Sequence, residues 1–101
     1  MNYTVGKNAK DNWLKWKEAS STDTIFHLEK FSSPYVIVKK SIIDLSMQEI
    51  TFLAQECLDH SKYKGMHSIY VFYTEKSNTT LGEEIGSFYI KSSKKKYRVL
   101  L

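Results

Sequence analysis

One seven-residue stretch, Ser68–Thr74, constrains the fold more than any other part of the sequence. It reads Ser-Ile-Tyr-Val-Phe-Tyr-Thr, so an extended chain places apolar side chains on both of its faces. A strand of this kind is typical of an inner position in a sheet that is covered on both sides. The apolar run is far shorter than a membrane span of about 20 residues, so we expect no membrane insertion. The sequence therefore predicts a central, doubly covered strand here.

The first helix is predicted over residues 8–19. Ala9, Trp13 and Trp16 follow one another at four and three residues, so they share one face of a helix. Two interpretations of the tryptophans are open: core packing, which the spacing favours, or exposure for stacking on nucleobases. Asn8 is placed to cap the helix N-terminus.

A second helix is predicted to begin after Ser46 and to end near His60. Ser46 and Glu49 form the sequence pattern of a capping box, in which each side chain bonds to the other residue's backbone N–H. The apolar face that follows has three- and four-residue spacing and consists of Met47, Ile50, Leu53, Ala54, Cys57 and Leu58.

Shorter apolar or alternating runs predict the remaining strands. These strands are expected at 2–5, 25–28, 35–39, 85–91 and 97–101. Residues 75–84 are predicted to form a polar loop, and Ser92–Lys96 a hairpin connection between the last two strands. The predicted fold is a single α+β domain over residues 1–101, with two helices packed on a sheet of about five mostly antiparallel strands.

Composition narrows the class of protein. A chain of 101 residues with 42% hydrophobic and 14% aromatic residues has enough apolar material for one folded core. The single cysteine cannot form an internal disulfide, which fits a reducing compartment. No apolar stretch near the start reads as a secretory signal. We therefore expect a soluble intracellular protein of the cytoplasm, with the nucleus left open.

The sequence contains no catalytic or cofactor motif that we recognise. Its four glycines are scattered and form no phosphate-binding loop. Cys57 and His60 have helical spacing that brings two metal ligands together, but zinc needs three or four and only His27 and His67 remain. Packing in the core is the favoured interpretation of Cys57, and a solvated turn that of Glu83–Glu84. We expect no enzyme, no metal and no cofactor.

The charge balance favours a polyanionic partner. Fifteen Lys and Arg residues against eleven Asp and Glu give a net charge of +4. Every cation except Arg98 is a lysine, and lysines act as point charges on phosphates rather than as bidentate readers of bases.

Short segments in a particular order then point to a family. In the first half they are Val5–Asn8 with Asn12, Asp23 with Phe26–Leu28, and Ser32–Ser33; in the second half they are His60–Lys62, Val71–Thr74, Ser77–Asn78 and Ile85–Phe88. Their order resembles the R domain of the NFACT proteins over nearly the whole chain. The spacing is most similar to the small eukaryotic branch typified by coiled-coil domain-containing protein 25. Two positions depart from the family pattern: Ile25 replaces a tryptophan, and Tyr35 replaces the histidine that usually follows the turn.

The resemblance implies a non-catalytic RNA-binding domain. Larger NFACT proteins engage tRNA on stalled large ribosomal subunits, so tRNA or structured rRNA in translation or ribosome quality control is the expected ligand. Lysine–phosphate contacts would supply most of the affinity. The alternative is an adaptor that binds protein or DNA through the same surface. The protein partner, if there is one, is not identified by the sequence.

The first group of candidate site residues lies around the start of the first helix. Gly6 is expected to permit a tight turn or a positive φ before the first helix, and Lys7, Asn8 and Lys10 to present an anion site at the helix N-terminus. For Asn8, capping alone is an equal alternative. Asn12 has three possible partners: a base edge, a ribose hydroxyl or a neighbouring loop.

His27 and the remaining lysines complete the set. Alternation directs His27 away from Phe26 and Leu28, so it either contacts RNA or is a buried histidine satisfied by Asp23 or a backbone carbonyl. The further candidates are Lys62, Lys64, Lys76, Asn78, Lys94, Lys95 and Lys96. The last three are predicted to lie at a mobile hairpin tip, either as a phosphate-contacting finger or merely solvated. Convergence of the other lysines on one face with Asn8 and His27 would favour nucleic acid, and a large apolar patch would favour protein.

Overall fold

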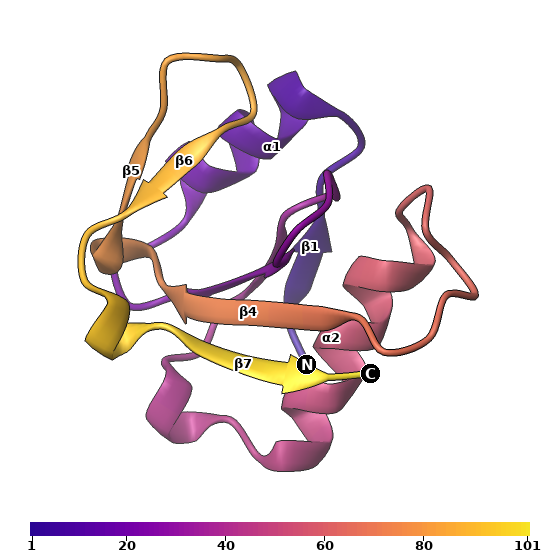
Figure 1. Ribbon diagram of the computed structural model, residues 1–101. Coiled ribbons are helices and arrows are strands. Elements are labelled where there is room, and N and C mark those ends of the chain that lie inside the picture. Colours follow the sequence, from indigo (N-terminus) through magenta and orange to yellow (C-terminus); the bar gives the residue numbers. More distant parts are fainter.

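Five antiparallel strands form the central sheet of the computed structural model, which describes all residues 1–101 (Figure 1). Their order across the sheet is β1-β3-β2-β4-β7. The strands are β1 (Tyr3–Val5), β2 (Thr24–Leu28), β3 (Val36–Val38), β4 (Tyr70–Glu75) and β7 (Tyr97–Leu100). The predicted α+β class and the sheet of five antiparallel strands are confirmed.

The doubly covered strand predicted from Ser68–Thr74 is β4. It pairs with β2 on one side and β7 on the other, and its residues from Val71 to Thr74 are buried. Only Tyr70, at its first position, is exposed. No helix of the structure has the length and apolar character that crossing a membrane requires.

The helices cover opposite faces of the sheet (Figure 1). Helix α1 spans Ala9–Glu18 and α2 spans Met47–Asp59. Ser46 and Glu49 form the predicted capping box in full, and His60 is the C-cap of α2. Single 3₁₀ turns occur at Ile42–Asp44, Lys76–Asn78 and Ser93–Lys95.

The face under α2 holds the larger core. Twelve buried residues form one cluster there, with Phe26, Val36 and Val71 from the sheet and Leu53 and Cys57 from the helix. Met47 was predicted to belong to this apolar face, but it is 64% exposed. Because it is the first residue of α2, the helix has not yet reached the sheet at that point.

The face under α1 holds a small aromatic core. Ile25, Tyr35 and Ile37 form its buried centre, and Trp13 and Trp16 pack against them. The core interpretation of the two tryptophans is therefore confirmed. Each indole N–H also donates a hydrogen bond, Trp13 to the Ser87 carbonyl at 2.9 Å and Trp16 to Thr79 Oγ1 at 2.8 Å.

A second, two-stranded sheet packs beside α1 (Figure 1). It pairs β5 (Thr79–Leu81) with β6 (Phe88–Ile90), so the prediction of a loop throughout 75–84 is wrong. The hairpin prediction for Ser92–Lys96 is wrong as well, because this segment passes from β6 in the small sheet to β7 in the large one. No backbone hydrogen bond joins residues 79–90 to the five-stranded sheet.

Candidate nucleic-acid interface

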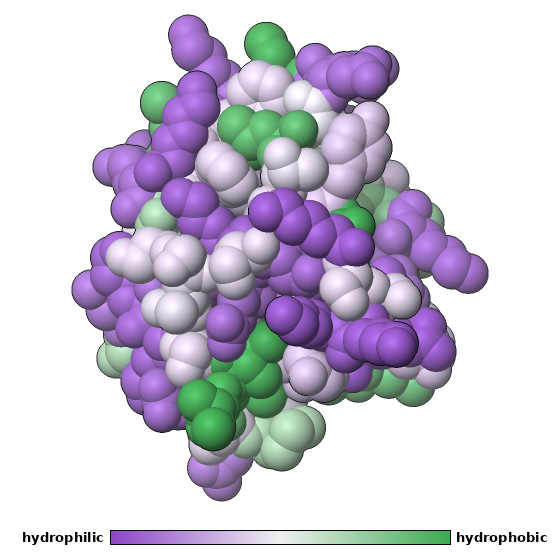
Figure 2. Space-filling view, turned by 90° about the vertical axis from the view of Figure 1, so that its left-hand side faces the viewer, coloured by the Kyte–Doolittle hydropathy of each residue, from purple (hydrophilic) through white to green (hydrophobic).

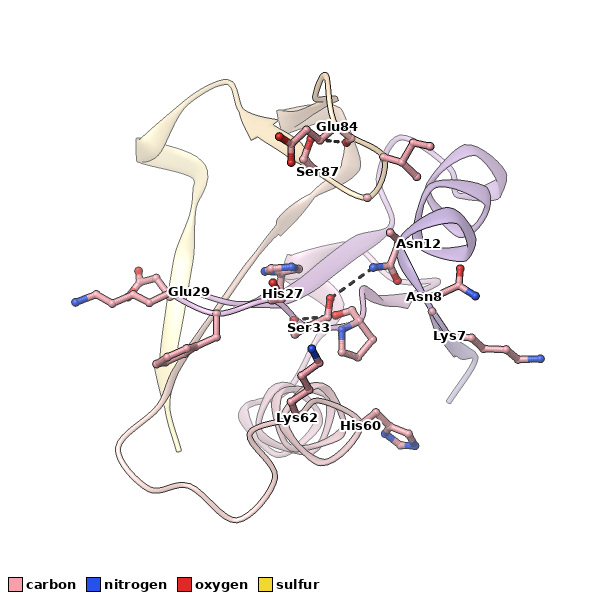
Figure 3. A pocket seen from close by; sticks show the side chains of 18 residues that line it. Lys7, Asn8, Asn12, His27, Glu29, Ser33, His60, Lys62, Glu84 and Ser87 are labelled. Carbon is pink, nitrogen blue, oxygen red and sulfur yellow. Dashed lines mark hydrogen bonds between the residues drawn. The ribbon is translucent and has the colours of Figure 1, made fainter.

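A polar cavity of about 650 Å³ opens beside the start of α1 (Figure 3). Its walls come from the first turn of α1, the end of β2 with the loop that follows, the end of α2, and the segment 84–87. Only three of its eighteen lining residues are hydrophobic. Its charged and polar lining residues include Lys7, Asn8, Asn12, His27, Glu29, Lys30, Ser33, His60, Lys62 and Glu84.

Asn8 caps α1 at the cavity wall. Its side-chain oxygen accepts a hydrogen bond from the Asp11 backbone N–H at 2.8 Å, as the capping prediction requires. The Lys7 backbone N–H donates to Asp11 Oδ2 at 2.9 Å. The backbone N–H groups of Ala9 and Lys10 have no acceptor within the protein. Two donors at the positive end of the helix therefore remain for an anion.

Two glycines allow the walls of the cavity to approach each other closely. Gly6 does not take the positive φ that was one of its two expected options, and a Cβ atom there would overlap the Asn12 side-chain oxygen. Gly86 does have a positive φ, of 91°, and a Cβ atom there would lie 2.6 Å from the Ala9 Cβ. The absence of side chains at both positions lets two strand–loop segments touch α1 directly.

Asn12 takes the neighbouring-loop option among its three predicted partners. Its side-chain oxygen accepts a hydrogen bond from the Tyr35 N–H at 3.0 Å, and its amide nitrogen donates to the Ser33 carbonyl at 3.5 Å. Only 6% of its surface is exposed. Asn12 therefore ties α1 to the loop before β3 and acts as a positioning residue in the cavity wall (Figure 3).

His27 lies at the end of β2 with its ring among three aromatic rings. It points away from Phe26 and Leu28, as alternation predicts, and both of these residues belong to the core under α2. Its Nδ1 is 2.7 Å from the Leu28 carbonyl oxygen, which is one of the partners proposed for a buried histidine. Burial lowers the pKa of His27 below its ordinary value, because desolvation disfavours the charged ring.

Three lysines contribute to the cavity without an ion-pair partner: Lys7, Lys30 and Lys62. Lys62 reaches from the end of α2 toward Ser33 in the middle of the cavity, while Lys7 extends from the rim beside Asn8 (Figure 3). Among the lining carboxylates, Glu29 is already paired with Arg98 at 3.0 Å and with Lys96 at 3.6 Å. Glu84 is the one unpaired acid, so the cavity has an excess of positive charge.

Several predicted site residues lie elsewhere. Lys10 neighbours the cavity in sequence but does not line it, and neither does Lys64. The Lys76 ammonium donates to the Ala19 carbonyl at 2.6 Å and lies 4.4 Å from the Trp16 ring centroid. Lys76 therefore helps to hold α1 in place.

Asn78 is also engaged within the fold. Its amide nitrogen donates to Thr74 Oγ1 and to the Ser92 carbonyl, both at 2.9 Å, and its oxygen accepts from the Ser92 N–H at 2.9 Å. Asn78 is buried and connects the two sheets. It belongs to a different part of the molecule from His27 and Lys62.

The lysines at 94–96 do not form a mobile hairpin tip. Ser93–Lys95 is a 3₁₀ turn, and the Lys95 carbonyl accepts a hydrogen bond from Thr74 Oγ1 at 2.8 Å. Lys96 bonds to Glu29 and lies 4.9 Å from the Phe72 ring centroid. Only the side chains of Lys94 and Lys95 remain without a partner.

Sequence reasoning missed Lys30 and His60 as site residues. Lys30 follows the Phe26–Leu28 motif by two residues, and His60 is the first residue of the His60–Lys62 segment that carries the resemblance. Both line the cavity. Their place beside these two segments was the signal that could have identified them.

Cys57 lies beneath the cavity and is fully buried. Its sulfur is 3.4 Å from both Ser33 Oγ and the Pro34 carbonyl. Burial raises the pKa of its thiol to about 11, so the thiol is protonated at neutral pH. His60 is exposed at the end of α2, and no three His, Cys, Asp or Glu side chains are grouped to hold a metal ion.

Comparison with known proteins establishes the fold. The chain matches no protein-family model and no curated protein. Among solved structures it is similar to the C-terminal part of the fibronectin/fibrinogen-binding protein from Streptococcus suis, with a TM-score of 0.82 and 22% sequence identity. The match covers 97% of this chain and 40% of that structure. At this identity the likeness shows a shared architecture.

Proposed function

We propose that this chain is a non-catalytic RNA-binding domain of the NFACT-R type that holds the phosphate backbone of tRNA or structured rRNA in the cavity beside α1. A role in translation or ribosome quality control follows from the resemblance described above. The observation that carries the proposal is the meeting of Lys7, Lys30 and Lys62 at one cavity with Ala9, whose backbone N–H at the start of α1 is free.

The chemistry of the cavity supports an anionic polymer over a small apolar ligand. Drug-sized ligands are usually held in concave pockets lined mainly by hydrophobic side chains, whereas this cavity is wide and polar. Ammonium groups and helix N-terminal amides are typical phosphate contacts. The unpaired lysines come from the segment before α1, from the loop after β2 and from the turn after α2, so they are spread along the opening in a way that suits several phosphates.

A filter-binding titration tests the proposal directly. Labelled tRNA, duplex RNA and duplex DNA are titrated with the protein at two salt concentrations. We expect micromolar binding of tRNA or structured RNA that weakens steeply with salt, with a log–log slope of about −0.7 to −0.9 for each neutralised phosphate. Affinity that does not change between the two salt concentrations contradicts the proposal.

A matched pair of double variants locates the binding site. Lys7→Ala with Lys62→Ala removes two charges from the cavity, and Lys94→Ala with Lys95→Ala removes two unpaired charges away from it. The cavity variant is expected to lower the salt slope by about 2, one for each phosphate contact. The control variant is expected to leave the slope nearly unchanged. Equal losses would mean that bulk charge, and not the cavity, binds RNA.

Protein binding is the second candidate, and one surface feature favours it. On the outer side of α2, Met47 is 64% exposed and Phe52 is 47% exposed, and both line a shallow hollow. The Streptococcus suis protein is described as binding fibronectin and fibrinogen. Figure 2 shows a different face, where hydrophilic side chains surround isolated apolar groups. A pull-down of protein partners with the wild-type chain as bait, and with Met47→Ser/Phe52→Ser as the control, distinguishes protein binding from RNA binding.

A further inference from the structure

The His27 ring is held in one orientation by aromatic neighbours. The ring centroids of Tyr35, Phe72 and Phe88 each lie 5.7 Å from that of His27. Tyr35 directly precedes β3, Phe72 belongs to β4 and Phe88 to β6, so residues of both sheets surround the ring. His27 nevertheless lines the cavity, where it lies behind Ser33 and Lys62 (Figure 3).

The hydrogen bond to Leu28 fixes which ring nitrogen carries the proton. A carbonyl oxygen only accepts, so the Nδ1 atom 2.7 Å from it has to be the donor. A neutral imidazole has one N–H, which leaves Nε2 as an acceptor. The lowered pKa of His27 favours this neutral form.

The Nε2 atom has no hydrogen-bond partner in the protein and is not sealed from solvent. It makes no hydrogen bond within the chain, and no side-chain nitrogen or oxygen is both sealed from solvent and unpartnered. His60 offers a contrast in the same cavity. Its Nδ1 is 2.9 Å from the Glu56 carbonyl, but its side chain is exposed and free of aromatic packing.

An acceptor at this position selects the chemistry of its ligand. Phosphate oxygens at neutral pH are acceptors, so they bind the lysines and the α1 amides but not a neutral Nε2. The partner of Nε2 has to be an O–H or N–H donor. In a nucleotide the donors are the ribose 2′-hydroxyl, the exocyclic amino groups of the bases, and the ring N–H groups of guanine and uracil.

We propose that His27 is the specificity-determining residue of the cavity, with Nε2 accepting a hydrogen bond from a 2′-hydroxyl or base amino group of a nucleotide whose phosphate lies on Lys62 and the start of α1. This inference rests on the proposed RNA-binding function. Lysine contacts supply affinity without regard to sugar or base, and His27 supplies the discrimination.

Matched oligonucleotides separate the two sources of the donor. Oligouridine and oligodeoxyuridine of equal length differ only in the 2′-hydroxyl. An oligodeoxyadenosine and its purine analogue without the 6-amino group differ only in the base donor. If the 2′-hydroxyl is the partner, the wild-type protein is expected to bind the ribo-oligomer about threefold to tenfold more tightly, the range for one net hydrogen bond. If the amino group is the partner, the same factor is expected within the adenine pair.

Two variants connect the preference to His27. His27→Phe keeps an aromatic ring beside Tyr35, Phe72 and Phe88 but has no acceptor, so it is expected to abolish the preference while salt-dependent binding persists. His67→Phe, at an exposed histidine that does not line the cavity, is the matched control and is expected to keep the preference. Circular dichroism checks folding. The wild-type comparison needs no substitution, so the proposal stays testable if His27→Phe does not fold.

Each outcome has one meaning. A preference within one pair that disappears in His27→Phe alone supports the proposal and identifies the donor. Binding of all four oligomers with equal affinity by the wild-type protein overturns it and leaves the proposed function standing. A preference that survives in His27→Phe also overturns it. If no nucleic acid binds at all, the proposed function fails, and this inference fails with it.

Discussion

The two faces of the central sheet are covered by different kinds of side chain. Under α2 the core is a cluster of twelve buried residues, mostly aliphatic, around Leu53. Under α1 only three residues form the buried centre, and larger rings with polar tips surround it. Trp13, Trp16 and Tyr35 each use such a tip to bond to the segment that carries β5 and β6. Asn8 and His27 lie on or beside this second face, whereas Lys62 reaches the cavity from the turn that follows α2.

The difference separates stability from binding. Aliphatic burial contributes roughly in proportion to the apolar area removed from water and gives no direction to its neighbours. Ring nitrogens and hydroxyls hydrogen-bond in particular directions and so position the loops that form the cavity. The α2 face is therefore expected to carry most of the free energy of unfolding, and the α1 face the geometry of the site.

Leu53→Ala gives the largest expected effect. Leu53 has no exposed surface, so the variant should lose about 2–5 kcal/mol of stability through lost burial and a residual cavity. Urea denaturation measures the loss. The RNA affinity of the fraction that remains folded should match that of the wild-type protein. A selective loss of affinity in the folded fraction would break the proposed separation of the two faces.

The next largest expected effect is a loss of RNA affinity when lysines near the start of α1 are replaced. Lys7→Ala with Lys10→Ala should weaken RNA binding more than the triple change at Lys94, Lys95 and Lys96, although the triple change removes more charge. Lys7 lines the cavity, and Lys10 lies in the first turn of α1. Lys96 is already engaged by Glu29. Affinity is compared at one salt concentration, and a greater loss in the triple variant would place the binding surface at the 3₁₀ turn.

Tyr35→Phe tests how the polar tips position the cavity. The variant removes the hydrogen bond from the Tyr35 hydroxyl to the Gly86 carbonyl, at 2.5 Å, while the buried ring remains. Stability should fall by about 0.5–1.5 kcal/mol, and RNA affinity should fall as the 84–87 wall loosens. Thermal unfolding and titration measure the two effects. Unchanged affinity alongside reduced stability would mean that this wall does not contribute to binding.

The smallest effect is a pH dependence that originates at His27. Its pKa is lowered in the folded state, so as the pH falls through the ordinary value of about 6.5 the unfolded chain takes up a proton that the folded chain does not. The free energy of unfolding should therefore decrease with falling pH, until the pH is below the folded-state pKa. The difference between wild type and His27→Phe isolates this contribution. A difference that does not change between pH 7.5 and pH 5 would contradict it.

Sequence reasoning succeeded where the signal was local. The capping box of Ser46 and Glu49 is complete within three residues, and the double-faced pattern of β4 needs only alternation. Strand β5 was missed because Thr79–Leu81 is three residues long and pairs with a partner nine residues further on. Ser92–Lys96 was predicted to be a hairpin because it is a short connection between two strands. The sequence does not show which sheet each of these strands joins.

The kinds of residue that form the candidate site could be predicted from the sequence, but the contacts of several of them could not. Lys7, Asn8, His27 and Lys62 do meet at one cavity. The burial of Asn12 and Asn78 was not predictable, because an amide that bonds across the fold has the same sequence pattern as one that faces a ligand. At Gly6 the reason for glycine is steric, because a side chain there would overlap Asn12, and only the folded position of α1 reveals this contact.

The separation of residues 79–90 from the backbone ladder of the main sheet sets the order in which parts of the molecule open. Contacts of side chains, and no backbone ladder, hold this segment against α1 and the residues at the start of β3. Residues 79–90 therefore form a smaller cooperatively unfolding unit than the sheet that α2 covers. Amide hydrogens of β5 and β6 should exchange with solvent through local opening, well before those of β2 and β4, which require global unfolding. A cavity with one such wall can adjust to ligands of different shape on a fast timescale while the rest of the domain remains native.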